Sequence, residues 1–564
     1  MNSTAIKHIA NLAEILVVND IKQVVISPGS RNAPLVIAFD NHPDIDTFVV
    51  HDERSAAFFA LGLIEANEKP AAIVCTSGSA TLNYAPAVAE AYYRQLPLLI
   101  LTADRPNYLI DQGDGQCIQQ DQIYTNFSKS FFKLPDLPKL DVDIQSSNQM
   151  VEEAIKKLKS SPQGPVHINI PLHEPLYETE VYQSSVFKQV ELEELSENLS
   201  EDKIHNLQRI WDLSAKKLII VGQLTSADML KTLIDLLAEN SSVAVLVENT
   251  SNLQNFHKLC HSIDRTLALI SPEEAAKFAP DLILSFGGAI ISKKIKAFFR
   301  THQPQHNWRI GQYLINEDTF LSKTETISIK PEKFLKLFIN REDQTLSTYG
   351  SQWKSKDFVA QEKHNLYLET CPYSDLLVFD YILDTIPDNS ILQMANSSVV
   401  RYCQLFNPIF TVKYYSNRGV SGIDGSTSTA VGMAVAVPDK LVTLITGDIS
   451  FFYDSNGLWN NYLPSNLRII LINNGGGGIF NILEGSRKSE QNDLFVAPHQ
   501  ANAEAICKAF NVNYTFTNSM ATIETEIQDF YSYALNNRPK LLEIDTIHIE
   551  SHKVLMSYFK FLGE

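Results

Sequence analysis

Two polar turns, near residues 448 and 474, carry the residue types of a divalent-cation site. Asp448 follows the apolar run 441–445, and Asn474 follows the apolar run 469–472. Each run is expected to be a buried strand, with a helix between them over 451–459. Such a strand–helix–strand unit leaves both strand ends on one edge, so Asp448 and Asn474 can face one point. With a carbonyl of the glycine run after Asn474, they offer the oxygen ligands that magnesium prefers.

A less specific interpretation fits the same stretch. A turn aspartate and a glycine-rich loop also occur in ordinary doubly wound sheets, where they only end strands. The residues of this stretch taken alone favour neither interpretation, so the rest of the chain has to decide.

The composition limits the class of protein. The chain has 564 residues, enough for two to four domains, and its 44% hydrophobic and 20% charged residues are typical of a globular protein. Its net charge of −18 argues against a nucleic-acid-binding surface. No apolar run is long enough for a membrane span, and the N-terminus lacks the order of a signal peptide. Six scattered cysteines without a Cys-x-x-Cys pair indicate reduced thiols in the cytoplasm.

Apolar runs that alternate with helical patterns predict three parallel-sheet units. The expected strands are 24–26, 47–50, 71–75, 98–101 and 166–170 in the first unit, 218–221, 243–247 and 282–286 in the second, and 391–394, 412–415, 441–445, 469–472 and 541–544 in the third. The fold class is therefore α/β, with three doubly wound domains at 1–185, 200–350 and 360–564. The acidic stretch 191–198 is expected to be a solvated linker rather than a functional tail.

Seven segments occur in one order that resembles the thiamine diphosphate-dependent enzymes, and within them the synthases of the menaquinone pathway. The segments are 27–31, 51–54, 76–80, 101–106, 416–419, 422–425 and 478–480. The likeness covers essentially the whole chain and is weakest in the middle domain. It implies an aminopyrimidine-binding first domain, a central domain, and a third domain that binds the diphosphate and the metal.

The resemblance implies thiamine diphosphate and Mg²⁺ (or Mn²⁺) as cofactors. Asp448, Asn474 and the carbonyl of Gly476 would hold the metal that clamps the diphosphate, with Gly447 and Ile449 beside the cofactor. The family often has a glycine where Ile449 stands, which is a departure from the pattern.

Glu53 begins a helical pattern after the expected strand 47–50. By resemblance its carboxyl group hydrogen-bonds the aminopyrimidine ring and so activates the cofactor's thiazolium carbon. Taken alone, it would be read as an acid that complements a helix dipole. By the same resemblance, Ile423 props the cofactor into a bent shape, and Ile479, Phe480 and Leu483 form an apolar wall that excludes water. Ile479 also contacts the cofactor, and Ile423 taken alone could be an ordinary core residue.

The implied reaction decarboxylates 2-oxoglutarate and adds the resulting succinyl carbanion equivalent to isochorismate. The product is 2-succinyl-5-enolpyruvyl-6-hydroxy-3-cyclohexene-1-carboxylate, an intermediate of menaquinone biosynthesis, with release of CO₂. Both substrates are dicarboxylates, which arginine forks bind well. The resemblance assigns Ser397, Arg401 and Arg418 to 2-oxoglutarate, and Ser30, Arg31, Arg105, Gln116 and Lys293 to isochorismate. Lys294 stands where an arginine is expected.

These assignments have simpler alternatives. Arg401 on a helix could be a solvated surface residue, and Arg105 before a proline could simply end a strand. His51, His167 and His173 match no zinc-ligand spacing and are expected to pack or to support other residues.

The family implies a homodimer or homotetramer with the active site between subunits. Two rival hypotheses remain. One is a different thiamine diphosphate enzyme, such as an acetohydroxyacid synthase or a 2-oxo acid decarboxylase. The other is a binding or regulatory protein that keeps the fold without the chemistry, against which Glu53, Asp448 and Asn474 count.

Overall fold

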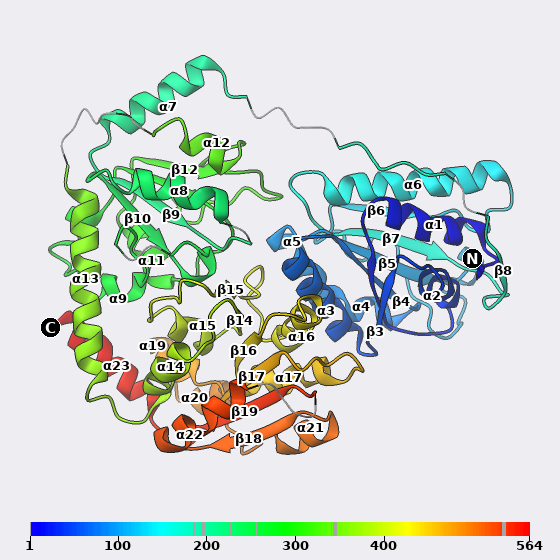
Figure 1. Cartoon of the computed structure of the whole chain (residues 1–564). Coiled ribbons are helices and arrows are strands. Elements are labelled where there is room, and N and C mark those ends of the chain that lie inside the picture. Colours follow the sequence, from blue (N-terminus) through cyan, green and yellow to red (C-terminus); the bar gives the residue numbers. More distant parts are fainter. Residues whose placement is uncertain are drawn as a thin grey trace.

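The computed structural model of the chain describes residues 2–183, 186–192, 198–225, 227–254, 257–339, 341, 347–532 and 537–564. Three parallel sheets, each with its helices, form the three lobes visible in Figure 1. Adjacent strand residues face different hydrophobic cores: Val25 lies in one core of the first unit, and Val24 and Ile26 lie in another. Both faces of the sheet are therefore covered, as parallel sheets require. The predicted three-unit α/β fold is confirmed.

The first sheet has the strand order β3-β2-β4-β5-β7-β6, and β1 and β8 form a separate antiparallel ribbon. The strands of the first unit, including this ribbon, are β1 Asn2–Thr4, β2 Gln23–Ile26, β3 Asp46–Val49, β4 Ala71–Cys75, β5 Leu98–Asp104, β6 Ser130–Lys133, β7 Val166–Pro171 and β8 Thr179–Val181. Its helices are α1 Lys7–Val18, α2 Ala33–Asp40, α3 Glu53–Asn67, α4 Ser79–Asn83, α5 Ala85–Arg94, the 3-10 helix η1 Asn107–Leu109 and α6 Asp141–Lys159.

The second sheet has the order β10-β9-β11-β12-β13. Its strands are β9 Lys217–Val221, β10 Val243–Val247, β11 Leu282–Phe286, β12 His306–Ile310 and β13 Glu325–Ile327. The helices are α7 Glu201–Leu213, α8 Asp228–Leu237, η2 Asn249–Ser251, α9 Ile263–Leu267, α10 Ala275–Phe278, α11 Lys293–Thr301, α12 Pro331–Leu335 and α13 Tyr349–Leu368. Helix α13 contacts β10 and also α23 (Ser551–Gly563) of the third unit (Figure 1).

The third sheet has the order β15-β14-β16-β17-β19-β18. Its strands are β14 Ile391–Met394, β15 Lys413–Tyr415, β16 Val442–Gly447, β17 Leu467–Asn473, β18 Asn513–Thr517 and β19 Lys540–Asp545. Its helices are α14 Asp375–Asp384, α15 Ser398–Cys403, α16 Ser426–Ala436, α17 Asp448–Tyr453, η3 Ser455–Leu458, α18 Ile479–Ile482, α19 Glu484–Arg487, α20 Asn492–Val496, α21 Glu504–Ala509, α22 Met520–Tyr531 and α23 Ser551–Gly563.

One predicted element differs from the structure. The helix expected over 451–459 is instead the short helix α17, which begins at Asp448, followed by the 3-10 helix η3. The reason lies at Asp454 between them, whose carboxylate accepts hydrogen bonds from the N–H and the Oγ–H of Ser428, each at 2.7 Å. These two bonds hold Asp454 against the start of α16, and the chain there leaves α-helical geometry.

Each expected strand is present, with ends shifted by up to three residues. The domain bounds 1–185, 200–350 and 360–564 stay a prediction, and α13 runs across the gap between the last two. The expected linker 191–198 lies largely outside the described residues. Among the described residues, no helix has both the length and the apolar character needed to cross a membrane.

The first and third units share one hydrophobic core. Phe58 and Phe59 of α3 belong to the same buried cluster as Val431 and Met433 of α16. The two helices cross so closely that a Cβ atom at Gly62 would overlap the carbonyl oxygen of Thr429. The crossing therefore requires a glycine and fixes the two units of one chain relative to each other.

Candidate active site

A cavity of about 340 Å³ opens at the carboxyl ends of β14, β16 and β17. Asp448 lines it directly after β16, and Asn474 lines it directly after β17. These strands are hydrogen-bonded neighbours in parallel register, so both side chains reach the same edge of the sheet. Gly447, Ile449 and Gly476 also line the cavity. The structure thus brings together every residue of the third unit that was expected around the metal and the diphosphate.

Backbone amides and a histidine surround the buried carboxylate of Asp448. The N–H of Ile449 donates to its Oδ1 at 2.7 Å, and the N–H of Gly476 donates to its Oδ2 at 2.8 Å. His499 Nε2 lies 3.2 Å from Oδ2. Burial raises the pKa of Asp448, and the two N–H groups and His499 oppose that rise. The sequence did not single out His499, because it lies on an irregular loop and has no motif around it.

A second buried carboxylate, that of Asp375, holds the side chain of Asn474. Asn474 Nδ2 donates to Oδ2 of Asp375 at 3.2 Å, and Thr546 Oγ1 donates to Oδ1 of Asp375 at 2.7 Å. Asp375 is 3% exposed and lines the same cavity. Sequence reasoning missed it, because a Ser-Asp pair at a helix start looks like an ordinary cap.

The loop after Asn474 is shaped by glycines. Gly475 has a φ of +76° and Gly476 a φ of +153°, and a Cβ atom at Gly476 would lie 2.6 Å from the carbonyl oxygen of Val496. The loop therefore approaches its neighbours too closely for a side chain. One carboxylate, one carboxamide and this side-chain-free loop fit a hard divalent cation with a phosphate group bound to it.

An apolar wall separates this cavity from a second one of about 260 Å³. Ile479 lines both cavities, Phe480 lines the first, and Leu483 lines the second. Ile423 lines the first cavity from the opposite chain segment and is 36% exposed, so it is not an ordinary core residue. The predicted apolar residues therefore lie on the surfaces where a cofactor and its reacting carbon would be shielded.

Ser397 and Arg401 connect the two cavities. Ser397 lines the first and has a φ of +67°, which is unusual for a residue with a side chain, while Arg401 lines the second. Arg401 Nη1 donates to the carbonyl oxygen of Ser397 at 2.5 Å. Arg418 lines neither cavity but donates from Nη1 to Oδ1 of Asn396, which lines the first, at 2.8 Å. Burial lowers the pKa of Arg418.

The central unit supplies two cations to the second cavity, Lys293 and Lys294 at the start of α11. The ammonium of Lys294 lies 3.3 Å from the ring centroid of Phe559. The buried Glu248 accepts hydrogen bonds from the N–H groups of Ile291 and Ser292, each at 2.7 Å. Burial raises the pKa of Glu248 to about 7. This acid fixes the backbone just before the lysines, and no motif around it pointed to this role.

Of the five residues predicted for the second substrate, all except Lys293 lie in the first unit. Ser30 and Arg31 follow β2, Arg105 follows β5, and Gln116 lies in the next loop. Arg31 Nη1 donates to the carbonyl oxygen of Leu172 at 2.9 Å, and its Nη2 lies 3.2 Å from Glu174 Oε1. Arg105 Nη2 donates to the carbonyl oxygen of Gly115 at 2.9 Å. Ser30, Arg31, Arg105 and Gln116 line neither of the two cavities within this chain.

Glu53 is the first residue of α3 and also lines neither cavity. Its Oε2 accepts a hydrogen bond from Asn83 Nδ2 at 3.0 Å. The preceding Asp52 caps the helix through the N–H of Ser55 and accepts a bond from Asn456 of the third unit at 2.8 Å. These contacts fix the start of α3, which carries Glu53 as its first residue, against the third unit.

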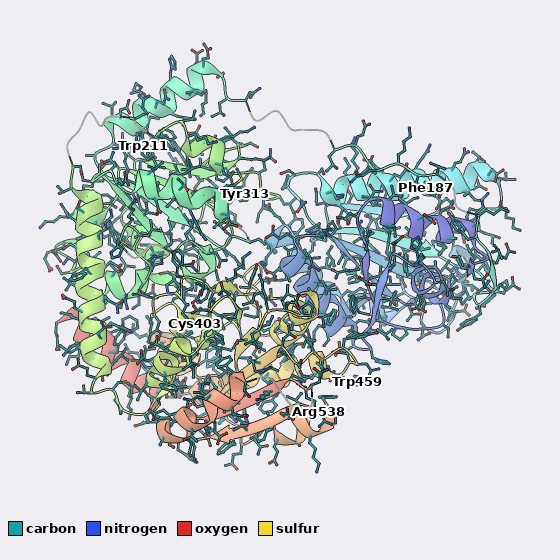
Figure 2. The ribbon with its side chains drawn as sticks, in the orientation of Figure 1. Phe187, Trp211, Tyr313, Cys403, Trp459 and Arg538 are labelled. Atoms are coloured by element: carbon teal, nitrogen blue, oxygen red, sulfur yellow. The ribbon has the colours of Figure 1, made fainter. Side chains whose placement is uncertain are left out.

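The three histidines make packing or hydrogen-bonding contacts. His51 stacks on Trp459 with the ring centroids 5.1 Å apart (Trp459 is labelled in Figure 2). His167 Nε2 lies 2.7 Å from Thr102 Oγ1, and His173 pairs with Asp136. Within the described part of the chain, no group of three or more His, Cys, Asp or Glu residues could hold a metal ion.

Comparison with known proteins bears on all three units. Residues 7–124 match the N-terminal TPP binding domain of thiamine pyrophosphate enzymes, residues 186–392 match their middle domain, and residues 397–544 match their C-terminal TPP binding domain. The chain is 41% identical to the 2-succinyl-5-enolpyruvyl-6-hydroxy-3-cyclohexene-1-carboxylate synthase of Christiangramia forsetii, with 98% of each chain covered. It is 40% identical to the synthase of Flavobacterium johnsoniae, again over 98% of each chain, and 36% identical to that of Desulfotalea psychrophila, over 95% of this chain and 98% of the relative.

Proposed function

The chain belongs to the thiamine diphosphate-dependent 2-succinyl-5-enolpyruvyl-6-hydroxy-3-cyclohexene-1-carboxylate synthases, and from this premise we propose that it joins 2-oxoglutarate to isochorismate. The reaction releases CO₂ from 2-oxoglutarate and adds the remaining succinyl group to the ring alkene of isochorismate. It supplies an intermediate of menaquinone biosynthesis. The observation that carries the proposal is the pair of adjoining cavities, one lined by Asp448 and Asn474 and the other by Arg401 and Lys293.

The first cavity suits the cofactor. We propose that Asp448, Asn474 and the carbonyl of Gly476 hold Mg²⁺ or Mn²⁺, and that the cation binds the diphosphate of thiamine diphosphate. The glycine loop and the buried carboxylate support this assignment. When bound, the cofactor supplies a carbon nucleophile and accepts the electron pair released on decarboxylation. Ile423 and Ile479 would orient it, and Gly447 and Ile449 would contact it.

The second cavity suits the dicarboxylate substrates. Arg401 and Ser397, with Arg418 nearby, would bind the distal carboxylate of 2-oxoglutarate, because a guanidinium matches a carboxylate with two parallel hydrogen bonds. Lys293 would add positive charge for isochorismate. Ile479, Phe480 and Leu483 would keep water from the reacting carbon, which favours addition over release of an aldehyde.

We propose a homodimer as the smallest active unit, with a homotetramer as a possible assembly of two. The support is that Glu53 lines neither cavity of its own chain, and neither do Ser30, Arg31, Arg105 and Gln116. A second copy would bring its own Glu53 to the first cavity and its own four polar residues to the second. There Glu53 would hold a proton against the ring nitrogen of the cofactor.

We also propose that the enzyme works in the cytoplasm. All six cysteines are free thiols, and four of them are buried. This usage fits a reducing compartment.

A product assay tests the function. The purified protein with thiamine diphosphate and Mg²⁺ is given 2-oxoglutarate or pyruvate, each with and without isochorismate, and the products are identified by mass spectrometry. The expected result is the succinyl adduct only where 2-oxoglutarate and isochorismate are both present. Turnover of pyruvate alone would instead assign the chain to an acetohydroxyacid synthase or a 2-oxo acid decarboxylase activity.

A further inference from the structure

The buried carboxylate of Asp375 lies beside Asn474 and lines the cavity that Asp448 also lines. Asp375 begins α14, and its own N–H donates to Ser551 Oγ at 3.0 Å. Oδ1 accepts from Thr546 Oγ1 at 2.7 Å, and Oδ2 accepts from Asn474 Nδ2 at 3.2 Å. Three segments that are distant in sequence are therefore joined at one acid, and one of them carries a proposed metal ligand.

We propose that Asp375 is a positioning residue that fixes the side-chain amide of Asn474 with its oxygen toward the cation site. The inference rests on the proposed metal and cofactor site, and it assigns to Asp375 a role that the family's ligand set does not include.

The argument starts from what each group can donate. A carboxamide has an oxygen that accepts and an NH₂ that only donates, and an ionised carboxylate only accepts. Asp375 can therefore pair with the NH₂ of Asn474 but not with its oxygen. Because the oxygen and the NH₂ of an amide point in different directions, holding the NH₂ at Asp375 leaves the oxygen free for the cavity that Asp448 and Gly476 also line.

Without that acceptor the amide has two similar orientations, and one of them points hydrogen atoms at the cation. The shape of the site alone does not choose between them, because the oxygen and nitrogen of an amide are nearly equal in size. Asn474 also packs against Gly478, where an added Cβ atom would lie 2.7 Å from Nδ2. This steric contact does not distinguish the oxygen from the nitrogen of the amide.

Exchanging the donor and the acceptor tests the inference directly. In Asp375→Asn two donors compete for the one remaining oxygen, and Thr546, which makes the shorter bond (2.7 Å against 3.2 Å), is expected to keep it. The NH₂ of the new amide then faces Asn474, which favours an Asn474 orientation with its oxygen turned away from the cation. In Asn474→Asp two carboxylates face each other. In the double variant Asp375→Asn/Asn474→Asp, the new aspartate accepts from the new amide with one oxygen and keeps the other for the cation. The control Thr546→Val removes the other partner of Asp375 and leaves its bond to Asn474.

The probe is Mn²⁺ with thiamine diphosphate. Free Mn²⁺ is measured by its electron paramagnetic resonance signal, and thiamine diphosphate affinity by calorimetry at fixed Mn²⁺. We expect about a tenfold or greater loss of both affinities in each single exchange, the size expected when a hydrogen bond to a charged group is lost. We expect the double variant to return to within about threefold of the unaltered protein, and Thr546→Val to stay within the same range.

Several results would overturn the inference. Asp375→Asn could bind as tightly as the unaltered protein, the double variant could bind no better than the single exchanges, or Thr546→Val could lose as much as Asp375→Asn. The last result would mean that Asp375 matters only for packing. If Asp375 were itself a ligand, the double variant would also stay weak. If Asp375→Asn does not fold, the comparison of Asn474→Asp with the double variant still decides. Failure of the unaltered protein to bind thiamine diphosphate with Mn²⁺ would remove the proposed function itself, a distinct outcome.

Discussion

Substituting Glu90 tests whether the first unit controls Arg418 of the third unit, which we propose binds 2-oxoglutarate. Glu90 lies on α5 and is 2% exposed. Its Oε1 accepts from the N–H of Gly419 at 2.8 Å, and its Oε2 accepts from the N–H of Val420 at 2.7 Å. These amides come directly after Arg418, so the carboxylate fixes the loop that carries this guanidinium.

The variant Glu90→Gln keeps the shape and removes one acceptor. One backbone N–H keeps its bond, and the other meets an NH₂ group. A buried donor without a partner costs about 1–3 kcal/mol. The loop can relieve that cost by moving, which displaces Arg418 from its contact with Asn396. If about 1.4 kcal/mol of the cost of the unpaired N–H is lost from the binding of the 2-oxoglutarate carboxylate to Arg418, the KM for 2-oxoglutarate rises roughly tenfold. Because Arg418 would bind substrate and transition state alike, kcat should change much less.

The assay is steady-state kinetics with 2-oxoglutarate varied at saturating isochorismate. Glu65→Gln is the matched control, since Glu65 pairs with Arg94 beside Glu90 but does not contact residues 419 and 420. Glu65→Gln should leave the KM for 2-oxoglutarate within about threefold. An unchanged KM in Glu90→Gln would refute the reasoning, and so would an equal rise in both variants.

Three further predictions concern Glu53, Asp448 and His167. Glu53→Gln should retain thiamine diphosphate affinity but lose turnover, because the amide cannot hold the required proton; full turnover in the product assay would remove Glu53 from the mechanism. Asp448→Ala should abolish Mg²⁺-dependent binding of thiamine diphosphate, and undiminished affinity by calorimetry would contradict the metal assignment. Burial lowers the pKa of His167 from 6.5 to about 3, so between these values the unfolded chain binds a proton that the folded chain does not, and stability falls as the pH drops. Between pH 6.5 and pH 3 the free energy of unfolding therefore falls by up to about 1.4 kcal/mol for each unit that the pH drops. His167→Gln should therefore show a smaller Tm difference between pH 7 and pH 5 by calorimetry than the unaltered protein, and an equal difference would count against this cause.

Strands whose residues are all buried were predictable from the sequence. Runs such as Ala71–Cys75 and Val243–Val247 are continuously apolar, which gives a strong local signal. The edge strands β6, β13 and β18 were missed because they contain lysine, glutamate or threonine and resemble loops in sequence. The inner strand β12 was also missed, because His306, Asn307 and Arg309 interrupt its apolar pattern. The helix over 451–459 was wrong because a distant hydroxyl group, that of Ser428, decides the local geometry.

The residues of the candidate site also divide into those that the sequence predicted and those that it could not predict. Asp448 and Asn474 could be found because each ends a recognisable strand. Asp375 and Glu90 could not, because their roles depend on partners about 100 and 330 positions away. The sequence around an isolated acidic residue does not indicate which distant N–H group will donate a hydrogen bond to it. Only the assembled fold reveals that contact.

The close crossing of Gly62 and Gly432 has a consequence for biosynthesis. These glycines stand 370 positions apart, so the ribosome needs roughly 20–70 s to deliver the second after the first. Throughout that interval α16 is not available to cover Phe58 and Phe59, so the nascent N-terminal unit exposes a hydrophobic surface to the cytosol. A chain that stops before α16 should therefore aggregate or be held by chaperones, and release from them should coincide with completion of the last third of the polypeptide.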